Sequence, residues 1–246
     1  MIVNELHWSV LKMMAKSPAH LREAYETGWK PTRPMTGGTL IHSLVLGGDV
    51  VVYEGQRRGK AWETFESEHE GRFIVTRKEF DEGRRAADAV LSDPIASRLL
   101  VGDKERAWAT RMFGRGCAGR IDCAGPNTIE LKSANDVEPE RFQRACLRMG
   151  YHAQLAWYSD ARRAMGEDPG EAFIIGVESR APFAVTVFRL TTRTLLEGQK
   201  LNRLWLERLA ACESADVWPG YTQSVVDLDI VEDAGLIIDG EEAEAA

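Results

Sequence analysis

The chain has 246 residues, of which 44% are apolar, and this is enough to build one sizeable hydrophobic core. Its formal net charge of −7 disfavours a non-specific coat on nucleic acid, and no apolar run approaches the roughly 20 residues that cross a bilayer. The four cysteines form no CxxC pair, and the N-terminus lacks a signal-peptide pattern. We therefore expect a cytoplasmic protein with reduced thiols and no membrane association.

Apolar residues in the first hundred positions recur mostly at helical spacing, with two short runs that suit strands. Ser17-Pro18 opens the second expected helix, because proline fits the first helical turn. Pro94 is expected to break the last helix of this part. In chain order we expect helices at 6–14 and 17–25, a loop rich in Pro and Gly at 28–38, a helix at 39–48, strands at 50–55 and 73–76, and a long helix at 78–100.

The second part of the chain alternates strand-like and helix-like segments. Pro139 and Gly166 suit the start and end of one long helix. In chain order we expect strands at 105–113, 117–123 and 128–132, a helix at 139–165, strands at 172–178 and 183–190, and a helix at 194–213. This order predicts an α/β domain with a mixed sheet, followed by an acidic, mobile end.

Charged residues gather in the stretch 117–133, which reads CAGRIDCAGPNTIELKS. Asp122 ends one apolar run, and Glu130 and Lys132 lie two apart in the next, after a Gly-Pro-Asn turn signal. Because strand residues two apart share a side, we expect Glu130 and Lys132 to face Asp122 across the strand pair. Two carboxylates suit Mg²⁺, and a nearby ammonium can hold a water or a developing charge on phosphorus.

These residues resemble the PD-(D/E)XK nuclease superfamily in type, order and spacing. Asp122 is followed by Glu130-Leu131-Lys132 and then by a helix that carries Gln154 and Tyr158, and this Gln-x-x-x-Tyr pattern resembles the RecB-like branch. The resemblance implies a single restriction-endonuclease-like α/β domain, with a central mixed sheet flanked by helices and an N-terminal helical extension.

Further segments are similar to the exonuclease VIII (RecE-type) nuclease domain, including phage-borne relatives. They are SPAHLREA, GGTLIHSLVL, RRGKAW, GYHAQLAWY and WPGY, and the resemblance spans roughly residues 6–221. It implies a helical N-terminal part at 1–100, a catalytic core at 101–222 and an acidic, flexible tail at 223–246. Two departures are Glu130, where these relatives often carry Asp, and Arg120, which stands near the place of an expected lysine.

The resemblance also implies an activity. It predicts a Mg²⁺-dependent DNA exonuclease that acts on duplex ends, 5′ to 3′, and leaves 3′ single strands for recombination or annealing. Mn²⁺ is expected to substitute for Mg²⁺, since a histidine ligand would favour it. A single-strand annealing protein is the implied partner, and a homo-oligomeric ring is the implied assembly.

Roles for individual residues follow from the same resemblance. Asp122, Glu130, the Leu131 carbonyl and His42 are the expected metal ligands, and Lys132 is expected to assist attack by water. Tyr151, Gln154 and Tyr158 share one helix face by their spacing, and Gln154 and Tyr158 are expected to hold the DNA backbone or the reacting phosphate. His152 lies off that face and is predicted to be structural.

Basic and polar residues around this centre are candidate DNA contacts. Between 103 and 163, 11 Lys and Arg face 8 Asp and Glu, so the zone is locally basic on an acidic protein. Glu105 is a candidate additional acidic residue near the metal. The predicted DNA-contact residues are Arg57, Arg58 and Lys60 near Trp62, and Arg120, Ser133 and Tyr151 near the centre.

Two other functions compete with the exonuclease. A Cas4-like or other RecB-like nuclease with an iron–sulfur cluster would need four grouped cysteines, and Cys117, Cys123, Cys146 and Cys212 do not have that arrangement. A catalytically silent DNA-binding relative is disfavoured because Asp122, Glu130, Lys132 and Gln154 are all retained.

Overall fold

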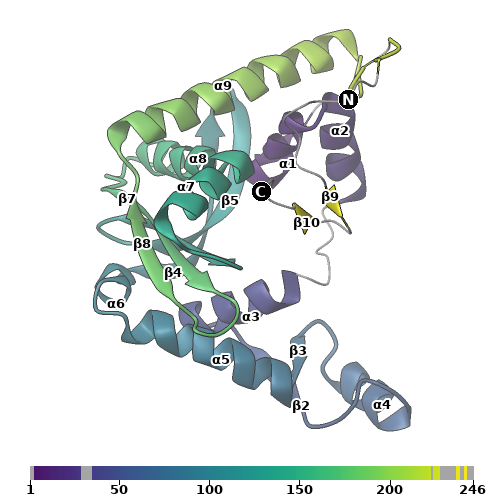
Figure 1. The fold of residues 1–246 in the computed structure, drawn as a ribbon. Helices are drawn as coiled ribbons and strands as arrows, with labels where there is room; N and C mark the ends of the chain where they lie inside the picture. Colours follow the sequence, from purple (N-terminus) through teal and green to yellow (C-terminus); the bar gives the residue numbers. More distant parts are fainter. Residues whose placement is uncertain (1–2, 29–34, 223, 228–236, 239–240, 243–246) are drawn as a thin grey trace.

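The computed structural model describes residues 3–28, 35–222, 224–227, 237–238 and 241–242. Its centre is a six-stranded mixed sheet, which confirms the predicted α/β class (Figure 1). The strands are β1 Glu5–His7, β4 Asp103–Met112, β5 Arg115–Ala124, β6 Thr128–Ala134, β7 Ala172–Glu178 and β8 Val185–Arg189. They follow the order β1-β5-β6-β7-β8, and β4 pairs with β5.

Strand β5 has three partners, and they leave a gap beside Asp122. β4 pairs antiparallel along the whole of β5 and so occupies one of its edges. β1 and β6 therefore share the other edge: β1 runs parallel to Gly116–Ala118, and β6 pairs only with Cys123 and Ala124. The β5 segment between these two pairings has no strand partner on that edge among the described residues.

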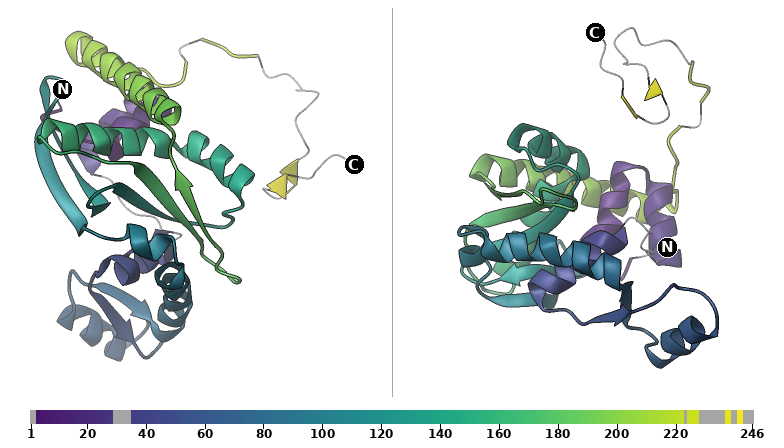
Figure 2. Two further views of the ribbon diagram at one scale, coloured as in Figure 1. Left: turned by 90° about the vertical axis from the view of Figure 1, so that its left-hand side faces the viewer. Right: turned by 60° about the horizontal axis from the view of Figure 1, so that its bottom comes forward.

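Helices cover both faces of the sheet (Figures 1 and 2). On one face of the sheet, α8 packs on β4 and β6, and α9 covers α8. On the other face, α3 packs on β6 and α5 packs on β7. The bounds are α2 Pro18–Thr27, α3 Met35–Leu46, α5 Arg77–Ser92, α6 Ala96–Leu99, α7 Pro139–Met149, α8 Tyr151–Ala164 and α9 Thr192–Ala215. No helix among the described residues combines the length and apolar character needed to cross a membrane.

A small lobe lies beside α3 and α5, outside the main sheet (Figure 2). It consists of the parallel strands β2 Val50–Tyr53 and β3 Phe73–Thr76, with α4 Lys60–Glu68 between them. Both strands were predicted, but the polar segment that forms α4 carried no assignment. Tyr53 holds α4 in place, because its ring lies 5.1 Å from the Trp62 ring and 4.9 Å from the Phe65 ring, centroid to centroid.

The predicted first helix at 6–14 is wrong in its first part. Residues 5–7 form β1, followed by the single turn α1 Trp8–Leu11 and the 3₁₀ turn η1 Lys12–Ala15. Leu6, Leu11 and Met14 are buried, as their spacing suggested. A three-residue strand is too short for alternation to reveal, and its partner β5 lies far along the chain. The predicted helical N-terminal part thus contains three strands.

The predicted helix at 139–165 is two helices. Gly150 adopts a left-handed conformation with φ 73°, ends α7 and begins α8. The change of direction leaves Met149, the last residue of α7, 49% exposed. In the loop predicted at 28–38, residues 29–34 lie outside the described part, and Met35–Gly38 already belong to α3.

The remaining predicted elements are close to the observed ones. The break at Pro94 is confirmed: the carboxylate of Asp93 accepts hydrogen bonds from the backbone N–H groups of Ile95 and Ala96, which begins α6. Helix α9 covers its predicted range of 194–213 and extends slightly beyond it at both ends. Most of the acidic end predicted to be mobile lies outside the described residues.

Glu213 of α9 ties the N-terminal segment to the sheet. Its Oε1 accepts hydrogen bonds from the backbone N–H of Val3 (3.0 Å) and from Arg115 Nη1 (3.1 Å), and its Oε2 accepts one from Arg115 Nη2 (2.9 Å). Burial alone would raise the pKa of Glu213, but these donors outweigh it and the pKa is lowered.

Glu213→Gln is therefore expected to destabilise the protein by about 1–3 kcal/mol at pH 7, because charge-assisted hydrogen bonds are lost. A lowered pKa means that the stabilisation is present above the unfolded pKa and is lost as the pH falls through the folded value. The difference in unfolding free energy between the wild type and Glu213→Gln should thus become smaller below about pH 4.5. Urea denaturation at pH 7 and pH 4 measures it, with Glu207→Gln, exposed on the same helix, as the control. A constant difference at both pH values would contradict this assignment.

Candidate active site

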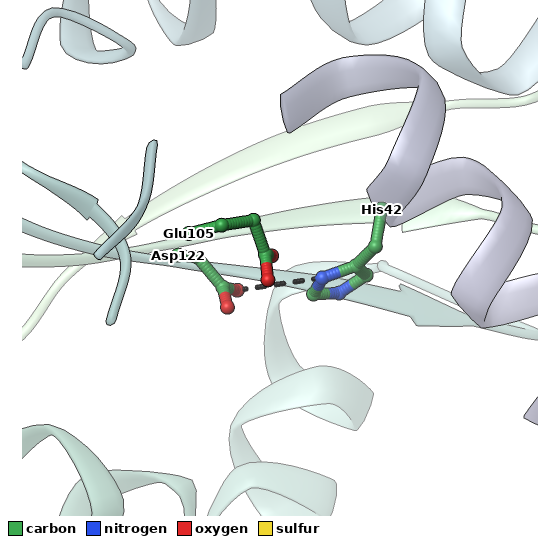
Figure 3. A group of neighbouring side chains, drawn as sticks. All are labelled: His42, Glu105 and Asp122. Carbon is green, nitrogen blue, oxygen red and sulfur yellow. Dashed lines mark ion pairs between the residues drawn. The ribbon is translucent and has the colours of Figure 1, made fainter. Parts of the chain in front are cut away.

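Three side chains from three elements converge beside the gap in the sheet (Figure 3). His42 comes from α3, Glu105 from β4 and Asp122 from β5. One ligand atom of each lies within 4.8 Å of the others, and His42 Nδ1 is 3.7 Å from Asp122 Oδ2. The structure thus brings the predicted ligands His42 and Asp122 together, and it places Glu105, the candidate additional acidic residue, beside them.

Asp122 occupies the point where β5 and β6 separate. Its Oδ2 accepts a hydrogen bond of 2.7 Å from the backbone N–H of Leu131, where the strand ladder has already ended. Burial raises the pKa of Asp122 well above its usual value, and the nearby Glu130 raises it further. Holding this carboxylate ionised therefore costs free energy that a bound cation would offset.

Glu130 lies deeper than Asp122 and is only 3% exposed. Its Oε1 accepts hydrogen bonds from Lys132 Nζ and from Gln154 Nε2, the latter at 2.8 Å. Its Oε2 is buried and has no hydrogen-bond partner among the described residues. A buried carboxylate oxygen without a partner is expensive, and a metal ligand is one role that explains it.

Lys132 is held between a carboxylate and an aromatic ring. Its Nζ pairs with Glu130 and lies 4.7 Å from the centroid of the Tyr151 ring. Burial alone would lower the pKa of Lys132, but the Glu130 and Asp122 carboxylates outweigh it and the pKa is raised. The side chain is therefore a fixed ammonium that can donate hydrogen bonds into the cleft.

Gln154 and Tyr158 stand behind Glu130. Gln154 Nε2 donates to Glu130 Oε1 and also to the hydroxyl of Tyr158, at 3.0 Å. Both side chains are buried and neither lines the cleft described below, so a direct contact of Gln154 or Tyr158 with DNA stays a prediction. Burial, and then Glu130, raise the pKa of Tyr158 well above its usual value, which keeps the phenol neutral.

A cleft of about 910 Å³ opens over the centre. Its walls carry His42, Glu105, Asp122 and Lys132, and it also contains Ser133, Tyr151 and Arg120 as predicted. Arg120 Nη1 pairs with Glu105 Oε2 at 3.1 Å. Four cations line the cleft and make it suitable for a polyanion: Lys12, Lys104, Arg120 and Lys132.

Lys12 is a residue of the cleft that sequence reasoning missed. It lies 5.3 Å from the centroid of the Trp8 ring, and Trp8 Nε1 donates to Asn202 Oδ1 at 3.2 Å. Burial lowers the pKa of Lys12, with repulsion from Lys132 as the next cause. The sequence pattern did not indicate a role for Lys12, because the position of this lysine depends on the pairing of β1 with the sheet.

Three predicted DNA contacts do not line this cleft. Arg57, Arg58 and Lys60 lie at the start of the lobe, before and within α4. Arg57 pairs with Glu79 at 2.7 Å and lies 5.8 Å from the Trp62 ring centroid, so it stabilises the lobe. A DNA contact by this group stays a prediction.

The cysteines and His152 have no place in the centre. All four thiols are free, and no cysteine belongs to a group of potential metal ligands in the described part of the chain. An iron–sulfur cluster therefore has no support in the structure. His152 is buried and does not line the cleft, and its structural role stays a prediction.

The residues present fit a divalent cation. Carboxylate oxygens and an imidazole are ligands that Mg²⁺ and Mn²⁺ accept. Burial and, after it, Lys132 lower the pKa of His42, which favours the neutral imidazole that binds metals. The Glu130 carboxylate and then the Leu131 backbone act in the opposite sense on the pKa of His42, but burial and Lys132 outweigh them.

Together, the mixed sheet, the acid–histidine group at its gap and the lysine beside it define a nuclease-like α/β domain. The family model described as "PDDEXK-like domain of unknown function (DUF3799)" matches residues 8–226, and the chain belongs to this family. The predicted PD-(D/E)XK membership is confirmed at this level. PDDEXK nucleases generally use divalent metals, which agrees with the donor set.

One solved structure of low sequence identity shares the fold of this chain. A crystal structure named "Putative exonuclease" from Eubacterium rectale aligns with a TM-score of 0.66 at 15% identity, covering 93% of this chain and 91% of that one. A phage-related exonuclease from Haemophilus somnus 129PT aligns at 12% identity with a TM-score of 0.38, over 87% and 96% of the two chains, which is too distant to support an argument. No curated protein sequence matches the chain.

Proposed function

We propose that the protein is a divalent-cation-dependent deoxyribonuclease that hydrolyses phosphodiester bonds at the ends of duplex DNA. The observation that carries the proposal is the cleft in which His42, Asp122 and Lys132 meet among further cations. By its resemblance to exonuclease VIII, we infer 5′-to-3′ degradation that leaves 3′ strands for an annealing partner, and assembly as a homo-oligomeric ring.

His42, Asp122, Glu130 and the Leu131 carbonyl would hold the cation, with Mg²⁺ as the first choice and Mn²⁺ as a substitute. Such an ion, when bound, supplies Lewis acidity and lowers the pKa of a coordinated water. The donor atoms fit this role because they are hard oxygens and one neutral imidazole nitrogen.

Residues of the chain beside the cation position the water, the metal ligands and the DNA. Lys132 holds the attacking water by hydrogen bonding and offsets the charge that develops on the phosphorus oxygens. Gln154 and Tyr158 act through Glu130, which they orient, and are therefore positioning residues. Lys12 and Arg120 line the cleft where they can contact neighbouring phosphates, and Ser133 and Tyr151 border the same space.

Incubation of linear duplex DNA with Mg²⁺ or Mn²⁺, with and without EDTA, tests the proposal. We expect degradation that EDTA stops, and release of a 5′ label before a 3′ label from end-labelled duplexes. A closed circular duplex should resist degradation. If the protein binds DNA but leaves it intact with both metals, the nuclease proposal is contradicted. The alternative of a catalytically silent DNA-binding protein would then be favoured.

Lys132→Met is expected to lower the hydrolysis rate at least ~10²-fold, because a preorganised cation is removed from the reacting centre. The methionine keeps most of the side-chain volume beside Tyr151, so DNA binding should persist. Lys200→Met is the matched control, since Lys200 also pairs with a glutamate, at 2.7 Å, but on α9. Circular dichroism must show both variants folded at the assay temperature. An active Lys132→Met enzyme would remove Lys132 from the chemistry.

A further inference from the structure

Glu105 stands directly across the β4–β5 ladder from Asp122. Lys104 pairs with Cys123 and Arg106 with Ile121, which leaves Glu105 and Asp122 opposite each other without a ladder pairing of their own. Residues directly opposite in an antiparallel pair point to the same face, and like charges there repel. The chain thus places two carboxylates together at a cost in stability.

The backbone at Glu105 adds to this cost. Its φ is 51°, in the left-handed region that residues other than glycine rarely adopt. Such a conformation costs on the order of 1–3 kcal/mol and persists only where the surroundings impose it. Regular pairing resumes on both sides, so the distortion is confined to the residue whose carboxylate reaches His42 and Asp122 (Figure 3).

The Glu105 carboxylate has neighbours of both charges. Arg120 Nη1 lies 3.1 Å from Oε2 and fixes the side chain in its orientation. An oxygen of the same carboxylate belongs to the group that lies within 4.8 Å of His42 and Asp122 ligand atoms. Glu130 is not in that group, and its buried Oε2 next to this centre is without a partner in the described residues.

We propose that Glu105 is a direct ligand of the divalent cation, oriented by Arg120, and that it completes a site with His42 and Asp122. This rests on the proposed function, since it presumes a cation at this centre. If one cation neutralises both opposed carboxylates, this accounts for their placement and for the strained backbone between regular pairs. The Arg120 guanidinium then orients the Glu105 carboxylate.

Direct binding of Mn²⁺ to the DNA-free protein, followed by electron paramagnetic resonance or calorimetry, tests the assignment without using activity. Glu105→Gln should weaken Mn²⁺ at least ~10-fold, because an anionic ligand is lost. Glu171→Gln should leave Mn²⁺ affinity unchanged, and it is matched because Glu171 also pairs with an arginine, Arg189, at 3.1 Å.

Metal-free thermal stability provides a second readout. With EDTA, Glu105→Gln should melt at the wild-type temperature or above it, because repulsion from Asp122 is relieved, while its stabilisation by Mn²⁺ should be smaller. If Glu105→Gln fails to fold, Glu105→Gly is used in its place. Glycine removes the carboxylate and readily adopts the left-handed backbone conformation. Arg120→Gln should weaken Mn²⁺ less than Glu105→Gln does. Equal losses would mean that Glu105 serves only to pair with Arg120.

The outcomes separate this inference from the proposed function. Wild-type Mn²⁺ affinity in Glu105→Gln together with lost affinity in Asp122→Asn would overturn the role of Glu105 and leave the cation site intact. Wild-type affinity in both variants would overturn the cation site itself.

Discussion

Asp122→Asn is expected to reduce DNA hydrolysis at least ~10³-fold while the protein stays folded. The carboxylate lies in the cation group and accepts the backbone N–H of Leu131 at 2.7 Å. Asparagine keeps an acceptor for this hydrogen bond and loses the charge that a cation needs. Time courses on linear duplex DNA with Mg²⁺ measure the loss.

The same variant should be more stable than the wild type without metal, by on the order of 1 kcal/mol at pH 7. Burial disfavours the ionised form of Asp122, as its raised pKa shows, and asparagine removes that charge. Chemical denaturation in EDTA measures the difference. Asp136→Asn is the control, because the carboxylate of Asp136 is partly exposed to solvent and pairs with Arg141 outside the cleft. A less stable Asp122→Asn protein would show that the folded state favours the ionised carboxylate.

Arg162→Met is expected to destabilise the protein by about 3–5 kcal/mol, because several buried acceptors lose their donor at once. The Arg162 side chain is 6% exposed. Its Nη1 donates to the carbonyls of Asn127 and Pro169 and to Thr128 Oγ1, and its Nη2 donates to the Gly125 carbonyl at 2.7 Å. Arg162 thus stabilises the turn between β5 and β6.

Urea denaturation compares Arg162→Met with Arg163→Met, its exposed neighbour on α8, for which a change below about 1 kcal/mol is expected. Arg162→Lys should recover less than half of the loss, because an ammonium cannot replace the planar fork. Equal effects at 162 and 163 would show that the turn does not depend on this side chain.

Most residues of the candidate site could be found from the sequence because their spacing depends on local structure. Asp122, Glu130 and Lys132 lie on adjacent strands joined by a three-residue turn, so alternation alone predicts their convergence. His42 was placed by resemblance, and the structure brings it to Asp122 from α3.

Features that depend on long-range packing could not be found in this way. Glu105 was a candidate acidic residue near the metal, but local spacing does not reveal the β4–β5 register that sets it opposite Asp122. Gln154 reads as a surface position until α9 covers α8 and Glu130 comes within hydrogen-bond distance. Gly150 reads as one tolerated glycine in a helix, because its left-handed φ is set by how α7 and α8 pack.

The shared edge of β5 has a consequence for the newly made chain. Glu5 pairs with Gly116, so more than a hundred residues must be synthesised before β1 finds its strand. At 5–20 residues per second, the first residues wait on the order of 5–20 s for a partner. The gap beside Asp122, and with it the candidate active site, therefore cannot form early in translation. A chain released prematurely, before β6, should leave the DNA around it intact.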